Sequence, residues 1–338
     1  MIETLRNWWV PLASALAVIA LPASVDAAPV HRIVAVGDLH GDYAAWRAIA
    51  RAAGLEDATG RWSGGSTVLV QTGDMVDRGP DSLKIVLDLM RLQREAARAG
   101  GRVVALVGNH EAMNVTDDLR YVSAGDYAAF ADTGSAALRD RAFAASKRAI
   151  EADYRRRDPA MSEAAIHAAW IAATPLGQIE HQAAWHPGGR IGRWIVANPA
   201  VALIDGTLFV HGGISTAFAR LPIAEINHRV DAALVARDAA PQAVINDPDG
   251  PLWNRHFAVA PSADTPASPI GAELDQVLKA YGAHRMVIAH TPILGGIAIL
   301  FGGRLVRIDT GISAVFGGMP DYLEIIDDVA VPHVVARP

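Results

Sequence analysis

Five short clusters of polar residues, each following an apolar stretch, carry side chains that can bind metal ions. They are Asp38-Leu39-His40-Gly41, Asp74-Met75-Val76-Asp77-Arg78-Gly79, Asn109-His110-Glu111, His211 and His290. Carboxylate, imidazole and amide oxygen form a mixed set of hard and borderline ligands, which suits manganese, iron or zinc better than calcium. The clusters therefore predict a metal site.

A pair of metal ions would overcome the two obstacles to hydrolysis of a phosphate monoester. Water is a poor nucleophile and the phosphoryl group is anionic, so the uncatalysed reaction is extremely slow. Two ions roughly 4 Å apart lower the pKa of a bridging water and neutralise phosphoryl oxygens. An aspartate can bridge such a pair, and Asp74 is the natural candidate.

Buried strands must bring the clusters together. Apolar runs at 33–36, 67–71 and 103–107 end just before the first three clusters, and 81–98 has near-helical apolar spacing. Further strands are predicted at 201–204, 208–210, 286–289, 297–300, 305–308 and 322–326. Ligands gather beyond the carboxyl ends of strands in open α/β sheets, so five such ends can converge on one site.

The segment 121–195 is alanine-rich, with charged residues at helical spacing, and Asp-Pro, Thr-Pro and His-Pro-Gly-Gly sequences divide it. We expect a helical insert that sits over the site and restricts which substrates enter. The segment 259–268 is rich in Pro, Ala and Ser and predicts an exposed loop.

At these motifs the sequence resembles the phosphoprotein phosphatase branch of the calcineurin-like metallophosphoesterases. Gly-Asn-His-Glu-Ala-Met-Asn-Val at 108–115, followed by Leu-Arg-Tyr-Val at 119–122, is most similar to the Shewanella-like protein phosphatases. The resemblance covers about 32–326, with a looser match in the insert. One departure is Thr116-Asp117-Asp118, where the subfamily usually has a glycine before the aspartate. The implied fold is an α/β sandwich of two mixed sheets flanked by helices, with the helical insertion.

The resemblance also implies how two divalent metal ions would be held, with manganese first and iron or zinc as alternatives. One ion would be bound by Asp38, His40 and Asp74. The other would be bound by Asp74, Asn109, His211 and His290.

The catalytic groups are implied by the same resemblance. His110 would be the general acid that protonates the leaving oxygen, with Asp77 orienting its imidazole, and Arg78 would clamp the phosphate. The residue types agree with these roles. Imidazole titrates near neutral pH, and the planar guanidinium matches phosphate oxygens.

Three further residues are expected to support the site. Glu111 would hold the ligand loops in place, because metal ligands need outer hydrogen-bond partners. A second phosphate-binding arginine is expected from the family. Arg255, in Pro-Leu-Trp-Asn-Arg-His, is the candidate and Arg120 is its rival. An ordinary surface salt bridge is the alternative role for either arginine.

The composition is that of a globular protein. Of its residues, 51% are apolar and 20% are charged, and a length of 338 residues is enough for one large domain or two small ones. The net charge of −6 argues against a nucleic-acid binder, since phosphate backbones are held by Lys and Arg. Cysteine is absent, which excludes thiolate chemistry and thiolate-bound zinc.

The N-terminus predicts a signal peptide over 1–27 and a mature domain over 28–338. Arg6 precedes an apolar stretch over 8–21, and Val25-Asp26-Ala27 fits the preference for small residues before a cleavage site. The alternative is an uncleaved membrane anchor, although the stretch is short and two prolines interrupt it. We expect export to the periplasm, with no stable membrane anchoring after cleavage.

These observations predict a binuclear-metal phosphatase that hydrolyses phosphate monoesters, with phosphorylated Ser/Thr or Tyr in proteins or peptides as substrate. The first alternative is a hydrolase of dinucleoside polyphosphates or other small phosphoesters on the same core. The second is a metal-stabilised binding protein without turnover, which the complete set of catalytic groups argues against.

Overall fold

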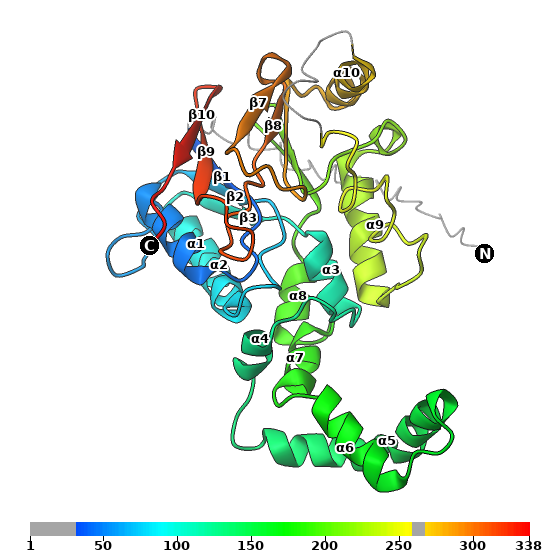
Figure 1. The fold of residues 1–338 in the computed structure, drawn as a ribbon. Coiled ribbons are helices and arrows are strands. Elements are labelled where there is room, and N and C mark those ends of the chain that lie inside the picture. The colour runs from blue at the N-terminus through cyan, green and yellow to red at the C-terminus, as the bar shows by residue number, and fades with distance from the viewer. Residues whose placement is uncertain (1–31, 259–267) are drawn as a thin grey trace, which may run out of the picture.

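The computed structural model describes residues 32–258 and 268–338. The predicted signal peptide, 1–27, lies outside the described residues, and so do residues 259–267 of the predicted loop. Two β-sheets with helices around them form the body of the protein, and a helical arm extends away from it (Figure 1).

The first sheet has the strand order β10-β9-β1-β2-β3. Its strands are β1 (Arg32–Val36), β2 (Val68–Gln71), β3 (Arg102–Ala105), β9 (Asp321–Ile326) and β10 (Val329–Val334). The neighbours β1, β2 and β3 are parallel, whereas β9 is antiparallel to both β1 and β10. The helices α1 (Tyr43–Ala52) and α2 (Ser82–Arg98) make the two parallel connections.

The second sheet has the strand order β4-β5-β6-β8-β7. Its strands are β4 (Val201–Ile204), β5 (Thr207–Val210), β6 (Arg285–Ile288), β7 (Ala298–Leu300) and β8 (Leu305–Arg307). The central strands β5, β6 and β8 are parallel, and β4 and β7 pair antiparallel at the two edges. The prediction of two mixed sheets is therefore confirmed.

The two faces of β1 show how the layers are held together. Val34 and Val36 belong to a core that includes buried residues of α1 and α2. Ile33 and Ala35 point the other way and pack with residues of the second sheet, including Phe209. Successive side chains of a strand face opposite sides, so an almost wholly apolar strand is suited to a central layer covered on both faces.

Every strand predicted from the sequence is present, with ends that differ by two residues or fewer. The strand β10 was not predicted. Most of its side chains are exposed and the others are half-buried, and Pro332 has no backbone N–H to donate. An edge strand of this kind lacks the apolar run that marks a buried strand.

The segment 121–195 contains most of the remaining helices before the second sheet. They are α4 (Ala124–Ala128), α5 (Ser135–Arg157), α6 (Glu163–Ala173), α7 (Gln178–Trp185) and α8 (Arg190–Val196). The last two pack against the core, with α7 contacting the site helix α3 (Asn109–Val115) and α8 contacting α9 (Ile223–Ala236). The helix α10 (Pro269–Tyr281) lies at the far end of the second sheet (Figure 1).

The expected position of the insert over the site is wrong. The helices α5 and α6 project away from the sheets as an arm (Figure 1), and each buries a single residue, Ser135 and Ile166 respectively. Such exposed helices are held mainly at their bases, because they bury little apolar surface. Across the described ranges, no helix is both long enough and apolar enough to span a membrane.

Candidate active site

The carboxyl ends of four strands and the start of α3 converge on one point between the sheets. Asp38 follows β1, Asp74 follows β2, His211 follows β5 and His290 follows β6, while Asn109 is the first residue of α3. His40, in the same turn as Asp38, completes the set. All six predicted metal ligands are brought together here, and none is more than 7% exposed.

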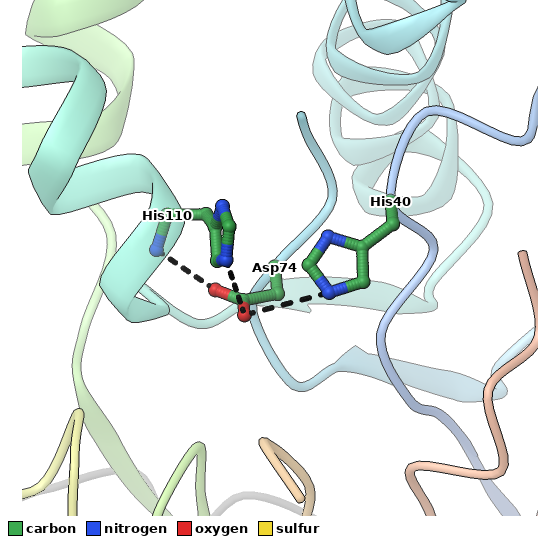
Figure 2. A group of neighbouring side chains, drawn as sticks. All are labelled: His40, Asp74 and His110. Carbon is green, nitrogen blue, oxygen red and sulfur yellow. Dashed lines mark hydrogen bonds and ion pairs between the residues drawn. The ribbon is translucent and has the colours of Figure 1, made fainter. Parts of the chain in front are cut away.

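Asp74 lies at the centre of the cluster. Its Oδ2 is 3.3 Å from Nε2 of His211, and its carboxylate stands between the imidazoles of His40 and His110 (Figure 2). Those two rings present Nε2 at 3.8 and 3.9 Å from the same oxygen. Two groups of donors are close enough to hold an ion, His40 with Asp74 and His110, and Asp74 with His211 and His290. Asp74 is in both groups, as a bridging ligand must be.

Three of the remaining donor atoms face one another. Nε2 of His211 lies 3.0 Å from Oδ1 of Asn109 and 3.2 Å from Nδ1 of His290. Among the described residues, Nε2 of His290 has no hydrogen-bond partner although it is buried. Buried polar atoms are nearly always paired. This arrangement therefore fits a site in which cations accept these lone pairs.

The pKa shifts of the clustered side chains also fit a metal site. Burial raises the pKa of Asp38 well above its ordinary value, and the neighbouring Asp309 and Asp74 add to the effect. Burial lowers the pKa of His40 to about 3 and that of His290 to about 2. These imidazoles are therefore neutral near pH 7, which is the form that binds metal ions.

Asp74 behaves differently from Asp38. Burial alone would raise its pKa, but the imidazole of His211, with those of His110 and His40, holds the pKa well below its ordinary value. Asp74 is therefore ionised. A buried, ionised carboxylate surrounded by nitrogen donors strongly attracts a divalent cation.

Strained turns aim these side chains at the centre. His40, Asp74 and His290 have left-handed backbones with φ of 39°, 53° and 68°, a conformation that non-glycine residues seldom adopt. The turns are tied together, since the backbone N–H groups of Leu39 and His40 both donate to the carbonyl of Asp74 at 3.0 Å. Gly108 is needed here, because a Cβ would lie 2.3 Å from Oδ1 of Asp74.

Glu111 joins the second and third clusters, as the sequence suggested for a loop-supporting residue. Its carboxylate accepts the backbone N–H groups of Gly108 and Asp74 at 2.8 Å each and that of Met75 at 2.9 Å. Burial, with the charge of Asp74, raises the pKa of Glu111 to about 7. Three backbone donors on one carboxylate fix the loop that carries Asp74 against the start of α3.

His110 and Asp77 form a close pair beside the metal-ligand cluster. Nδ1 of His110 lies 2.6 Å from Oδ2 of Asp77, which leaves Nε2 directed toward the pocket. Burial would lower the pKa of His110, but the carboxylates of Asp74 and Asp77 raise it above its ordinary value. Asn114 donates to both Oδ1 of Asp77 and the carbonyl of His110 at 2.9 Å, so the pair is held from behind.

The cluster forms the floor of an open pocket of about 160 Å³. The pocket is lined by His40, Asp74, Arg78, Asn109, His110, Tyr121, Trp253, Arg255, His290, Pro292 and Phe316. The guanidinium of Arg78 lies between two rings, 4.6 Å from the centre of Tyr121 and 5.1 Å from that of Phe316. Stacking of this kind fixes the plane of an arginine side chain.

The two candidates for a second arginine differ in position. Arg255 lines the pocket beside Trp253, whereas Arg120 does not. The side chain of Arg120 is 65% exposed and is paired with Asp118. The pair with Asp118 favours the alternative role of Arg120, an ordinary surface salt bridge, although its guanidinium lies 5.8 Å from the ring centre of Tyr121. Asp117 stands where the family usually has a glycine before the aspartate. It has a left-handed φ of 65°, a conformation that favours glycine, and its side chain pairs with Arg237.

Sequence reasoning missed the walls of the pocket and one buried acid. Tyr121, Trp253 and Phe316 line the pocket, yet a single aromatic residue in a loop carries no pattern that predicts this position. Asp309 is 2% exposed and raises the pKa of Asp38 by its charge. The sequence did hold a signal for Asp309. Like the ligand clusters, it directly follows an apolar run, and Thr310-Gly311 comes after it.

The chain is similar to known proteins over most of its length. The family model of calcineurin-like phosphoesterases matches residues 31–318. Shewanella-like protein phosphatase 2 of Arabidopsis thaliana is 33% identical over 318 residues, which is 91% of this chain and 78% of that protein. Shewanella-like protein phosphatase 1 of Plasmodium berghei is 25% identical over 306 residues, 88% and 72% of the two chains.

The fold is also similar to solved structures. The cold-active protein-tyrosine phosphatase of a psychrophilic Shewanella species superposes with a TM-score of 0.65 at 22% identity, over 91% of this chain and 81% of that chain. At this identity the likeness concerns the fold.

Replacing Glu111 with glutamine tests the clamp on the ligand loops. The side-chain NH₂ of glutamine is a donor, and it would face a backbone N–H that now donates to a carboxylate oxygen. That hydrogen bond would be lost, so we expect the free energy of unfolding to fall by about 1–3 kcal/mol. Urea denaturation measures the change, with Glu163→Gln on the exposed face of α6 as the matched control. Equal stability of the two variants would show that Glu111 does not hold the loop.

Proposed function

Because the chain belongs to the calcineurin-like phosphoesterase family, which confirms the resemblance of its motifs, we propose a specific substrate class for this metal-dependent phosphatase. The substrate is a phosphorylated protein or peptide, and phosphotyrosine is the preferred residue. The observation that carries this proposal is the aromatic wall of the pocket above the buried ligand cluster.

The ligand cluster is assigned as a two-metal site. Asp38, His40 and Asp74 would hold one divalent ion, and Asp74 would hold the second together with Asn109, His211 and His290. Manganese is the proposed metal, because the set mixes carboxylate, amide and imidazole donors, with iron or zinc as alternatives. When bound, such ions supply Lewis acidity toward water and phosphoryl oxygens.

The residues of this chain that act on substrate lie around that cluster. Arg78, held flat by its two aromatic neighbours, binds phosphoryl oxygens, and Arg255, which lines the same pocket, is the second arginine that binds them. Water adds to phosphorus as the ester P–O bond breaks. His110 then supplies a proton from Nε2 to the leaving oxygen, while Asp77 keeps the imidazole in the required orientation.

The walls of the pocket carry aromatic residues, whereas its floor consists of the metal-ligand candidates. Phe316 and Tyr121 flank Arg78, and Trp253 packs edge-on to His290 with ring centres 5.5 Å apart. A phosphotyrosine ring bound with its phosphate on the floor can stack against such walls. Aromatic pairs add about 0.5–1.5 kcal/mol beyond the burial of their area. Phosphoserine and phosphothreonine lack that contribution.

We also propose that the protein is exported to the periplasm. The support is in the sequence of 1–27, with its apolar stretch and the small residues before position 28. N-terminal sequencing of the protein from a periplasmic fraction tests this proposal. A first residue other than Ala28, or retention in the membrane fraction, would contradict it.

Chelation and substitution of His110 test the assigned chemistry together. A chelator should abolish activity on p-nitrophenyl phosphate, and manganese should restore it. On phenyl phosphate, whose leaving oxygen needs a proton, His110→Asn should lower kcat about 10²- to 10⁴-fold in the manganese-loaded protein, the usual contribution of a positioned general acid. The exposed His167→Asn on α6 is the control. Turnover by His110→Asn at the control rate would remove the assignment of the acid.

A substrate panel tests the aromatic wall. We expect Phe316→Ala to raise KM for a phosphotyrosine peptide about 3- to 10-fold, the equivalent of the stacking energy, with little change for a phosphothreonine peptide. Val315→Ala is the matched control, since Val315 is the preceding residue and is 59% exposed. Faster hydrolysis of a dinucleoside tetraphosphate than of either peptide would favour the dinucleotide hydrolase instead.

A further inference from the structure

A small cavity lies between the helical insert and the back of the His110–Asp77 pair. It is lined by Val76, Asp77, Ser82, Leu83, Asn114, Asp126, Phe130, His181, Trp185 and Ile191. It offers about 10 Å³ to the centre of a water molecule, which is room for one. The cavity therefore joins residues of the catalytic core to residues of α7 and α8.

Asn114 presents an unpaired acceptor in this region. Its Nδ2 donates to Asp77 and to the carbonyl of His110, and both partners are acceptors, so the orientation of the amide is settled by chemistry. Its Oδ1 is buried, and within the described ranges no donor reaches it. Since Asn114 is 1% exposed, bulk water cannot satisfy this oxygen.

His181, on α7, presents the second unpaired atom. It is 3% exposed, and its Nδ1 has no partner in the part of the chain that the structure describes. Its ring is packed between the aromatic rings of Tyr127 and Phe130, with ring centres 5.5 and 5.1 Å away. Burial lowers the pKa of His181 to about 4, so the ring is neutral near pH 7 and has one N–H to donate and one lone pair to accept.

Two buried polar side chains with unpaired atoms, at a cavity that fits a single water, define a hydration site. We propose that one buried water joins Nδ1 of His181 to Oδ1 of Asn114, and that His181 is thereby a positioning residue for His110. This inference rests on the proposed role of His110 as the general acid. The linkage runs from His181 through water to Asn114, and from Asn114 to both members of the pair.

This assigns the insert a role in the rate of the reaction. The helix α7 contacts α3, the helix that carries both His110 and Asn114. Loss of the water contact releases Asn114, and with it the orientation of the Asp77 carboxylate that aligns the imidazole. The rate then falls most for substrates whose leaving oxygen needs a proton, because a good leaving group departs as the anion.

The experiment compares phenyl phosphate, which has a basic leaving group, with p-nitrophenyl phosphate, which has a much less basic one. His181→Phe keeps an aromatic ring and removes the hydrogen bond. We expect kcat on phenyl phosphate to fall about 10-fold, as for other outer-shell partners, and kcat on p-nitrophenyl phosphate to fall by less than about 3-fold. KM should be unchanged for both. His181→Asn, whose amide can occupy the place of Nδ1, should restore most of the rate.

Two reference variants make the result decisive. His167→Phe is the same substitution on the exposed α6 and should match the unsubstituted protein. His110→Asn sets the leaving-group dependence that follows from loss of the acid. If His110→Asn slows both substrates equally, the acid assignment fails and the present inference fails with it. If His110→Asn discriminates while His181→Phe does not, only the role of His181 is overturned.

A high-resolution crystal structure of the unsubstituted protein decides the matter if His181→Phe does not fold. A water within hydrogen-bond distance of both Nδ1 of His181 and Oδ1 of Asn114 is the expected result. A dry cavity, or a direct contact between the two side chains, would overturn the proposal.

Discussion

The site depends on the burial of several carboxylates in one small region between the sheets. Asp38 and Asp74 lie there almost without contact with solvent, and Glu111 is fully buried behind them. Their mutual repulsion in a poorly hydrated environment is unfavourable unless opposite charge is present. The neutral imidazoles of His40 and His290 supply lone pairs and no positive charge, so divalent cations suit this arrangement. Five chain segments converge here because two cations need more ligands than one segment supplies.

The surrounding structure holds this unfavourable arrangement in place. Left-handed turns at His40, Asp74 and His290 direct the side chains inward, and parallel strands place these turns at one edge of each sheet. Glu111 anchors the loop of Asp74 through three backbone donors. Backbone strain of this kind persists only where neighbouring contacts over-determine the conformation. The rigid sandwich of two sheets supplies those contacts.

Two different sets of residues surround the cluster, one on the side of the pocket and one behind the His110–Asp77 pair. Aromatic residues from distant loops form the walls of the pocket and hold Arg78 in one plane. On the opposite side of His110, the base of the helical insert closes a cavity behind Asp77. The arm of α5 and α6 lies beyond that base and lines neither space. The segment that the sequence suggests as a cap over the substrate is thus, at its base, a support for the catalytic pair.

The sequence by itself determined the buried strands, the fold class and the six candidate metal ligands that meet at the site. Buried strands such as β1 and β2 are apolar throughout, and polar clusters follow them directly, so local pattern carries this information. Only the tertiary structure decided the place of the insert, the outward turn of Arg120 and the inward position of Phe316. These depend on contacts between segments far apart in the chain. Periodicity records whether a residue faces the core, and it holds no information about which distant residue it meets there.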